Sequence, residues 1–146
     1  MKTAYSAIEA VSVEYITREI ATARLSVSAG FPSPAGDDLE DPIDLIAWII
    51  RHEHATFWYR VSGNSLCRVG IMDGDFVAID RAGKVKPGRT VLALHNGDML
   101  LKVLTHRDGR AWLEARSDEH YPPLPVLEST EIFGVVAGIA RRYPVE

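Results

Sequence analysis

A serine stands just beyond a strand-like segment near the middle of the 146-residue sequence. In Val61-Ser62-Gly63-Asn64-Ser65-Leu66 the segment runs into Gly63, and Ser65 follows shortly after it. Such a position can hold a hydroxyl in the open beside free backbone N–H groups, which an acyl-transfer nucleophile and its oxyanion hole both need. Glycine and serine at a strand end more commonly form an ordinary turn, so this segment alone does not identify a nucleophile.

A lysine interrupts an otherwise apolar strand-like segment, Leu100-Leu101-Lys102-Val103-Leu104. Because side chains alternate along a strand, Lys102 shares a face with Leu100 and Leu104. One interpretation is an edge strand whose lysine reaches water and discourages aggregation. The other is a lysine that is desolvated, so that its pKa falls and a neutral amine is available as a general base near neutral pH.

A serine nucleophile with a lysine base is a known variant of the catalytic triad that needs neither histidine nor aspartate. The histidines are therefore not required for this chemistry. They lie in loops, at the ends of elements or beside charged residues, without HxxxH or HExxH spacing. We expect surface positions, rather than triad membership or zinc binding, for His52, His54, His95, His106 and His120.

Three other residues near Ser65 could carry chemistry. Asp73 and Asp75 could form a carboxylate pair, but the glycine between them favours a tight turn with aspartates at its corners. Cys67 could be the nucleophile itself. No histidine close in sequence and no basic helix end is present to activate it, so we expect a structural thiol.

Six short segments rich in β-branched, aromatic and leucine residues must position these groups. We predict strands over residues 56–61, 75–80, 90–95, 99–104, 111–115 and 132–140. Turn signals separate the strands, and Asn96-Gly97 and Asp108-Gly109 are the strongest hairpin signals. This spacing predicts a mostly β protein, a compact antiparallel domain with one short helix and a flexible N-terminal arm.

The N-terminal part of the chain has a different composition. Residues 1–28 have helix-compatible spacing that several β-branched residues weaken. Residues 29–36 are rich in glycine and proline and are typical of an exposed, extended linker. With Asp41 as N-cap and Pro42 at the first helical position, we expect a helix that ends near His52.

Composition narrows the class of protein. With 47% hydrophobic and 25% charged residues, the chain has the balance of a soluble globular domain. One cysteine excludes an internal disulfide framework, and no apolar run approaches the ~20 residues of a membrane span, so we expect a cytoplasmic protein. The net charge of -4 argues against a protein that mainly grips duplex DNA and favours protein partners.

Together these segments resemble the UmuD family, the LexA-like self-cleaving subunits of SOS mutagenesis. The resemblance rests on Val27-Ser28-Ala29-Gly30-Phe31-Pro32-Ser33-Pro34-Ala35, Ser62-Gly63-Asn64-Ser65-Leu66, Ile71-Met72-Asp73-Gly74-Asp75 and Lys102, and covers residues 25 to about 140. The Ala-Gly-Phe-Pro-Ser-Pro-Ala run is specific to the UmuD branch, whereas Ser-Gly-x-Ser is shared across LexA-like serine peptidases. Ile132-Phe133-Gly134-Val135-Val136 also resembles the closing strand of that domain.

The resemblance implies a LexA/UmuD-type serine peptidase domain over residues 41–146 and a linker over residues 30–40. It implies that residues 1–29 are an arm that self-cleavage removes. Ser65 would be the nucleophile, Lys102 the general base and Ala29-Gly30 the scissile bond. The backbone N–H of Ser65, with that of Asn64, would stabilise the oxyanion.

The resemblance also implies partners. A RecA filament on single-stranded DNA would stimulate cleavage, and the product would join an error-prone, UmuC-like Y-family DNA polymerase as a homodimer for translesion synthesis. We expect no cofactor, no metal, no direct sequence-specific DNA binding and no membrane partner.

Two positions depart from the family pattern. Asn64 and Leu66 stand where family members commonly carry aspartate and methionine. Neither position has a catalytic role, and leucine keeps the apolar volume of methionine, so we expect activity to survive. The small residues Ala29 and Gly30 suit a narrow cleft, and tethering the substrate in the same chain raises its effective concentration.

Two other functions are compatible with the sequence. The first is a non-catalytic, polymerase-binding module that retains the peptidase fold, although the joint presence of Ser65, Lys102 and the cleavable linker argues against it. The second is a truncated LexA-type repressor, which the short arm and the acidic charge disfavour.

Overall fold

The structure is a computed structural model that describes residues 7–11, 19–20 and 43–146. These residues belong to two compact units. One unit contains residues 7–11 and 52–146, and the other contains residues 19–20 and 43–51. The expected linker, the expected scissile bond Ala29-Gly30 and the expected N-cap Asp41 lie outside the described residues.

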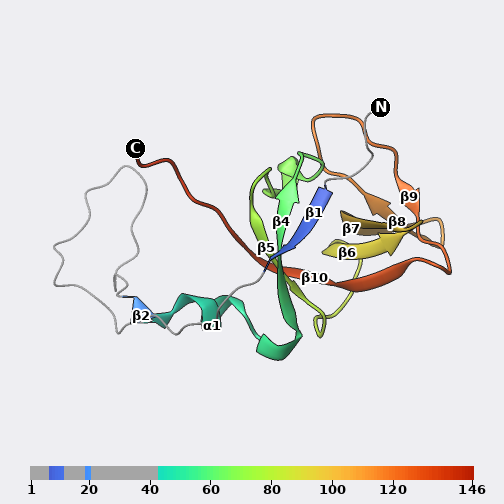
Figure 1. The fold of residues 1–146 in the computed structure, drawn as a ribbon. Helices are drawn as coiled ribbons and strands as arrows, with labels where there is room; N and C mark the ends of the chain where they lie inside the picture. Colours follow the sequence, from blue (N-terminus) through green and yellow to red (C-terminus); the bar gives the residue numbers. More distant parts are fainter. Residues whose placement is uncertain (1–6, 12–18, 21–42) are drawn as a thin grey trace. The chain divides into compact units, whose positions relative to one another are not determined.

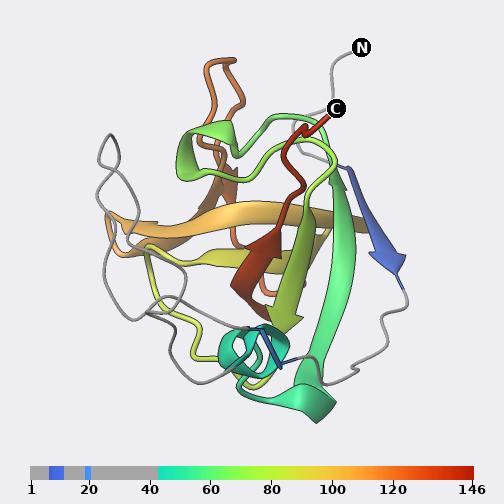
Figure 2. The same ribbon diagram turned by 90° about the vertical axis from the view of Figure 1, so that its left-hand side faces the viewer.

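The larger unit is built around one sheet of eight strands, all paired antiparallel (Figures 1 and 2). The sheet has the order β1-β4-β5-β10-β6-β7-β8-β9. Its strands are β1 (Ala7–Val11), β4 (Thr56–Ser62), β5 (Phe76–Asp80), β6 (Thr90–His95), β7 (Asp98–Arg107), β8 (Arg110–Glu114), β9 (Leu124–Pro125) and β10 (Glu131–Ala140). Because β1 at one edge also contacts β7, the sheet curls on itself. The expected mostly β, antiparallel class is confirmed.

The six predicted strands are all present as β4, β5, β6, β7, β8 and β10, with β7 longer than expected. Both hairpin predictions are confirmed. Asn96 and Gly97 join β6 to β7 with φ of 50° and 83°, and Asp108 and Gly109 join β7 to β8 with φ of 54° and 74°. Positive φ at both central residues is the requirement of the tight turn that matches strand twist.

The helix expected within residues 1–28 is wrong where the structure describes that segment. Residues 7–11 form β1, which pairs with β4, and β2 (Glu19–Ile20) pairs with β3 (Ile43–Asp44) in the smaller unit. These strands form because a partner strand supplies their backbone hydrogen bonds, and the local sequence pattern does not reveal that partner.

The helix of the smaller unit is shorter than expected. It is α1 (Leu45–Ile49), and Asp44 is its N-cap, with a carboxylate that accepts from the backbone N–H of Ala47 at 3.1 Å. Ile50 returns to extended geometry with φ -91° and ψ 112°, which ends the helix well before His52. No helix among the residues described is long and apolar enough to cross a membrane.

Two apolar clusters pack on the larger unit's sheet. The first joins side chains of β4, β5, β6 and β7 and of the loop between β4 and β5, namely Val61, Leu66, Ile71, Val77, Ile79, Leu92, Leu101 and Val103. The second contains Val91, Ala93, Leu104, Leu113 and Val135. Since Leu101 and Val103 belong to the first cluster and Leu104 to the second, β7 separates the two and contributes to both, as the alternation of a strand requires.

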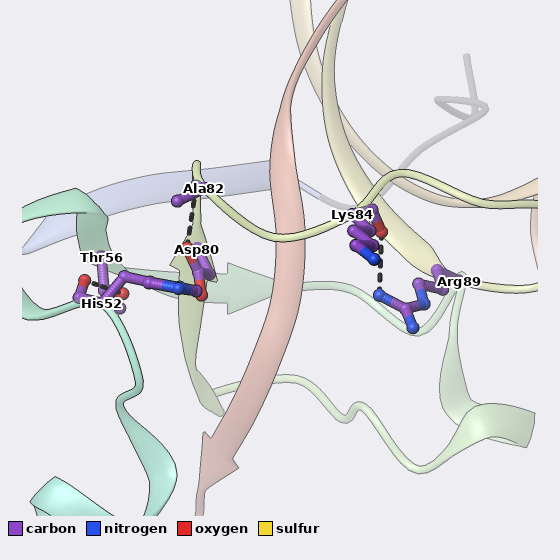
Figure 3. A network of polar contacts seen from close by, with 6 residues as sticks. All are labelled: His52, Thr56, Asp80, Ala82, Lys84 and Arg89. Carbon is purple, nitrogen blue, oxygen red and sulfur yellow. Dashed lines mark hydrogen bonds and ion pairs between the residues drawn. The ribbon is translucent and has the colours of Figure 1, made fainter.

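The entry to β4 is fastened by a polar network (Figure 3). His52 Nδ1 lies 2.6 Å from Asp80 Oδ2, and Asp80 Oδ1 accepts from the backbone N–H of Ala82 at 2.8 Å. The Thr56 hydroxyl donates to the carbonyl oxygen of His52 at 2.7 Å. The network therefore ties the first residues of the larger unit to the end of β5.

Candidate active site

Ser65 lies in the turn between β4 and the short 3-10 helix η2 (Cys67–Val69). The strand ends because Gly63 adopts a φ of 91°, a conformation that L side chains rarely take. Its backbone N–H donates to Asp73 Oδ1 at 2.8 Å. The glycine thus turns the chain, and Asp73 holds the turn in place.

The Asp73-Gly74-Asp75 segment forms a second turn that clamps the end of β4. The N–H of Gly74 donates to the carbonyl oxygen of Val61 at 2.7 Å. The N–H of Val61 donates to the carbonyl oxygen of Asp75 at 2.9 Å. Gly74 has a φ of 87°. The expectation of a turn with aspartates at its corners is confirmed, and both carboxylates act in it as hydrogen-bond acceptors.

Asp75 is a buried carboxylate with several partners. Arg141, just beyond β10, donates to its two oxygens at 2.7 Å each, and the backbone N–H of Met72 donates to Oδ2 at 2.7 Å. The hydrogen bond from Arg141 lowers the pKa of Asp75, against the opposing effect of burial. The carboxylate is therefore ionised and holds the turn next to Ser65 in a single geometry.

Ser65 itself is fully buried, with 0% of its surface exposed, so the expectation of an open hydroxyl is wrong. Its neighbour Leu66 packs into the first apolar cluster, which draws the turn onto the sheet. The carbonyl oxygen of Ser65 accepts from the backbone N–H of Arg116 at 2.7 Å, and the N–H of Arg68 donates to the carbonyl oxygen of Arg116 at 2.8 Å. The serine turn is thereby fixed to the segment that follows β8.

Lys102 lies in the interior of the sheet, on β7 between β6 and β8. Only 1% of its surface is exposed, and its partner on β6 is the buried Val91. Burial lowers the pKa of Lys102 from 10.5 to about 8. The interpretation of Lys102 as an edge-strand lysine that reaches water is therefore wrong, and the interpretation as a desolvated lysine is confirmed.

The strand register brings Ser65 and Lys102 to the same short segment. Lys102 directly precedes Val103, which pairs with Glu114, the last residue of β8. Arg116, two residues after Glu114, holds the carbonyl oxygen of Ser65. The end of β8 and the residues just after it therefore connect the strand that carries Lys102 with the Ser65 turn.

An aromatic ring covers the lysine. Tyr121, in the loop between β8 and β9, lies with its ring centroid 5.1 Å from Lys102 Nζ. Its hydroxyl donates to Glu119 Oε2 at 3.0 Å. A ring face attracts an ammonium group but not a neutral amine, so this contact bears on the charge state of the lysine.

The remaining candidate residues are the histidines and Cys67. Four of the five histidines are exposed, as expected, but His95 is buried, with Nδ1 2.8 Å from Thr130 Oγ1, so the surface prediction is wrong there. Cys67 is half-buried, and its sulfur lies 3.7 Å from the Ser117 hydroxyl. Among residues 7–11, 19–20 and 43–146, no group of three or more His, Cys, Asp or Glu residues could hold a metal ion.

Sequence reasoning did not identify Tyr121, Arg116 or Arg141 as parts of this region. The first reaches Lys102 from a loop, the second acts through its backbone, and Arg141 lies 66 residues from Asp75. No local pattern in the sequence marks such contacts. The oxyanion assignment to Ser65 and Asn64 stays a prediction.

Comparison with known proteins agrees with this architecture. The "Peptidase S24-like" family matches residues 20–137. Protein ImpA of Salmonella typhimurium is 40% identical over 116 residues, which are 78% of this chain and 78% of ImpA. Protein MucA of Escherichia coli is 35% identical over 120 residues, 82% of each chain. The LexA repressor of Clostridium novyi (strain NT) is 32% identical over 117 residues, 80% of this chain and 57% of the repressor.

The family match covers most of the chain, and it includes the Ser65 turn, β7 with Lys102 and the Asp73-Gly74-Asp75 turn. The matched region takes up nearly the same share of ImpA and of MucA as of this chain, whereas it takes up a smaller share of the LexA repressor, which is a longer protein. The serine turn, the buried lysine and these matches together lead to one conclusion: the chain belongs to the S24 peptidases, in the UmuD-like, LexA-type family.

Proposed function

We propose that this protein is a Ser/Lys peptidase that cuts its own Ala29-Gly30 bond. The observation that carries the proposal is the buried Lys102, with its pKa lowered to about 8, on the strand that pairs with β8, whose following residues hold the Ser65 turn. A lysine of ordinary pKa is almost wholly protonated at neutral pH, whereas this one is roughly one-tenth neutral there. The amine is thus available to accept a proton.

The reaction follows from these groups. Lys102 Nζ, as the neutral amine, accepts the hydroxyl proton of Ser65 while Oγ attacks the carbonyl carbon of Ala29. The backbone N–H groups of Ser65 and Asn64 stabilise the oxyanion. The C–N bond to Gly30 then breaks, and the Lys102 ammonium returns the proton to the leaving nitrogen. Water hydrolyses the ester on Ser65, which releases residues 1–29 and restores the hydroxyl.

The cellular role is proposed from the family. A RecA filament on single-stranded DNA stimulates the cleavage, and residues 30–146 then act as a homodimeric regulatory subunit of an error-prone, UmuC-like translesion polymerase. The acidic net charge of -4 agrees with a subunit that meets DNA through other proteins.

The test is mass spectrometry of the purified full-length chain after incubation at alkaline pH and, separately, with RecA activated on single-stranded DNA. We expect two products that meet between Ala29 and Gly30. Ser65→Ala and Lys102→Ala should give neither product. The matched controls are Ser62→Ala and Lys86→Ala, since both of these side chains are exposed and should leave cleavage at the wild-type rate.

Two outcomes would contradict the peptidase assignment. One is a wild-type chain that stays intact under both conditions, and the other is wild-type cleavage by the Ser65→Ala or Lys102→Ala variant. Polymerase binding that needs no cleavage would then favour a non-catalytic module that retains the peptidase fold.

A further inference from the structure

Lys102 has two neighbours with opposite effects on its charge. The apolar strands around it exclude water, which favours the neutral amine. The Tyr121 ring lies 5.1 Å from Nζ and attracts the ammonium through the negative face of its π system. The strands are part of the core, whereas Tyr121 belongs to the loop between β8 and β9.

Three acidic or apolar neighbours of Lys102 and Tyr121 define the surroundings of this contact. Glu119 Oε2 accepts a hydrogen bond from the Tyr121 hydroxyl at 3.0 Å, at the exposed end of the ring. Glu114 of β8 lies opposite Val103, on the other face of the sheet from Lys102, and lies 3.5 Å from both Arg107 and Arg116. On β6, the residue paired with Lys102 is the apolar Val91.

We propose that Tyr121 is a positioning residue that keeps Lys102 largely in its ammonium form in the resting protein and so restrains self-cleavage at neutral pH. The inference rests on the proposed function of Lys102 as general base. Any movement of the Tyr121 loop away from the lysine, while the site stays closed to water, shifts the proton equilibrium toward the active amine. The ring then inhibits the base by stabilising its ammonium form, and a displacement of the loop between β8 and β9 would remove this inhibition.

The test separates the aromatic face from the shielding that the side chain provides. Tyr121→Leu keeps apolar cover over Lys102 but removes the π face, whereas Tyr121→Phe keeps the face and loses only the hydroxyl. In a Ser65→Ala background, which stays uncleaved, NMR titration of ¹³C-labelled lysine reports the Lys102 midpoint directly. We expect Tyr121→Leu to lower this midpoint by about half a unit to one and a half units, and Tyr121→Phe to leave it nearly unchanged.

Cleavage by the full-length chain with Ser65 intact gives the second readout. At neutral pH, Tyr121→Leu should cleave roughly two- to eightfold faster than the wild type, because more of Lys102 is neutral. At alkaline pH, where the amine is neutral in both proteins, the two rates should converge. A residue with a merely structural role would change the rate equally at all pH values.

A midpoint in Tyr121→Leu that is equal to the wild type or higher would overturn the proposal. If that variant does not fold, fluorinated phenylalanines at position 121 weaken the ring's negative face at nearly constant size, and the Lys102 midpoint should fall stepwise with fluorination. A flat series would also overturn it. A midpoint that falls while no Ser65-containing variant cleaves would leave the ring contact intact and refute the peptidase function instead.

Discussion

Arg141 binds both carboxylate oxygens of Asp75 at 2.7 Å and also donates to the carbonyl oxygen of Gly70 at 2.6 Å. The pair connects the end of β10 to the turn that clamps β4 immediately before Ser65. The geometry of the serine turn therefore depends on a residue near the end of the chain.

Removing the carboxylate of this pair should destabilise the protein. Asp75→Ala leaves the Arg141 guanidinium and the Met72 N–H without their acceptor, and we expect a loss of about 1–3 kcal/mol in the free energy of unfolding. Urea denaturation measures it. Arg68→Ala, which breaks an exposed pair with Asp118, is the control and should change nothing measurable. Equal stability of Asp75→Ala and the wild type would show that the clamp is unimportant.

The same pair predicts an acid dependence. Because the folded-state pKa of Asp75 is lowered by Arg141, its stabilising contribution is complete above the ordinary value of 3.8 and is lost as the pH falls below that value. Thermal denaturation from neutral to strongly acidic pH should therefore show a steeper acid-side loss in the wild type than in Asp75→Asn. Parallel curves for the two proteins would argue against this contribution.

Lys102 should reduce stability in exchange for reactivity. Its pKa is about 8 in the fold and 10.5 when unfolded, so its cost to stability is full below pH 8 and disappears as the pH rises toward 10.5. We expect Lys102→Met to raise the unfolding free energy at neutral pH by about 1–3 kcal/mol and to abolish cleavage. The gain should vanish at high pH. Lys86→Met, at an exposed position, is the control, and a destabilised Lys102→Met would contradict the prediction.

The cleavage rate should follow the neutral fraction of Lys102. Below a midpoint near pH 8 the rate should rise about tenfold for each pH unit, and above it the rate should level off. First-order rates from gel densitometry across this range give the profile. A midpoint near the ordinary lysine value of 10.5 would mean that the lysine is solvated in the reactive state.

Gly134 of β10 should tolerate no side chain. A Cβ there would lie 2.7 Å from the carbonyl oxygen of Asp80 and 2.9 Å from Ile79 Cγ2, and the backbone oxygen cannot move aside cheaply. We expect Gly134→Ala to lower the unfolding free energy by roughly 1–3 kcal/mol, as overpacking does. Ala137→Ser, at an exposed position on the same strand, should be close to neutral. Denaturant midpoints compare the two, and an unchanged Gly134→Ala would mean that β10 can shift.

The strands that sequence reasoning located are those with strong local signals. β6 ends and β8 begins at a glycine turn, and the hairpins at Asn96-Gly97 and Asp108-Gly109 need backbone angles that few other residues adopt. The missed elements depend on partners. The sequence of β1 is compatible with a helix, but its pairing with β4 makes it a strand. The two-residue β9 is a strand because it pairs with β8. The surface prediction for His95 fails because its hydrogen-bond partner Thr130 lies 35 residues further along the chain.

The Ser65 segment, the Asp73-Gly74-Asp75 turn and the lysine between apolar residues are local patterns, so the sequence alone is enough to single them out as candidates. The burial of Lys102 depends on the tertiary structure, since a lysine on a strand is solvated or desolvated according to which strands flank it. The tertiary structure also places Tyr121 over Nζ. The proton affinity of a base depends on all the groups around it in space, and those groups come from distant parts of the chain.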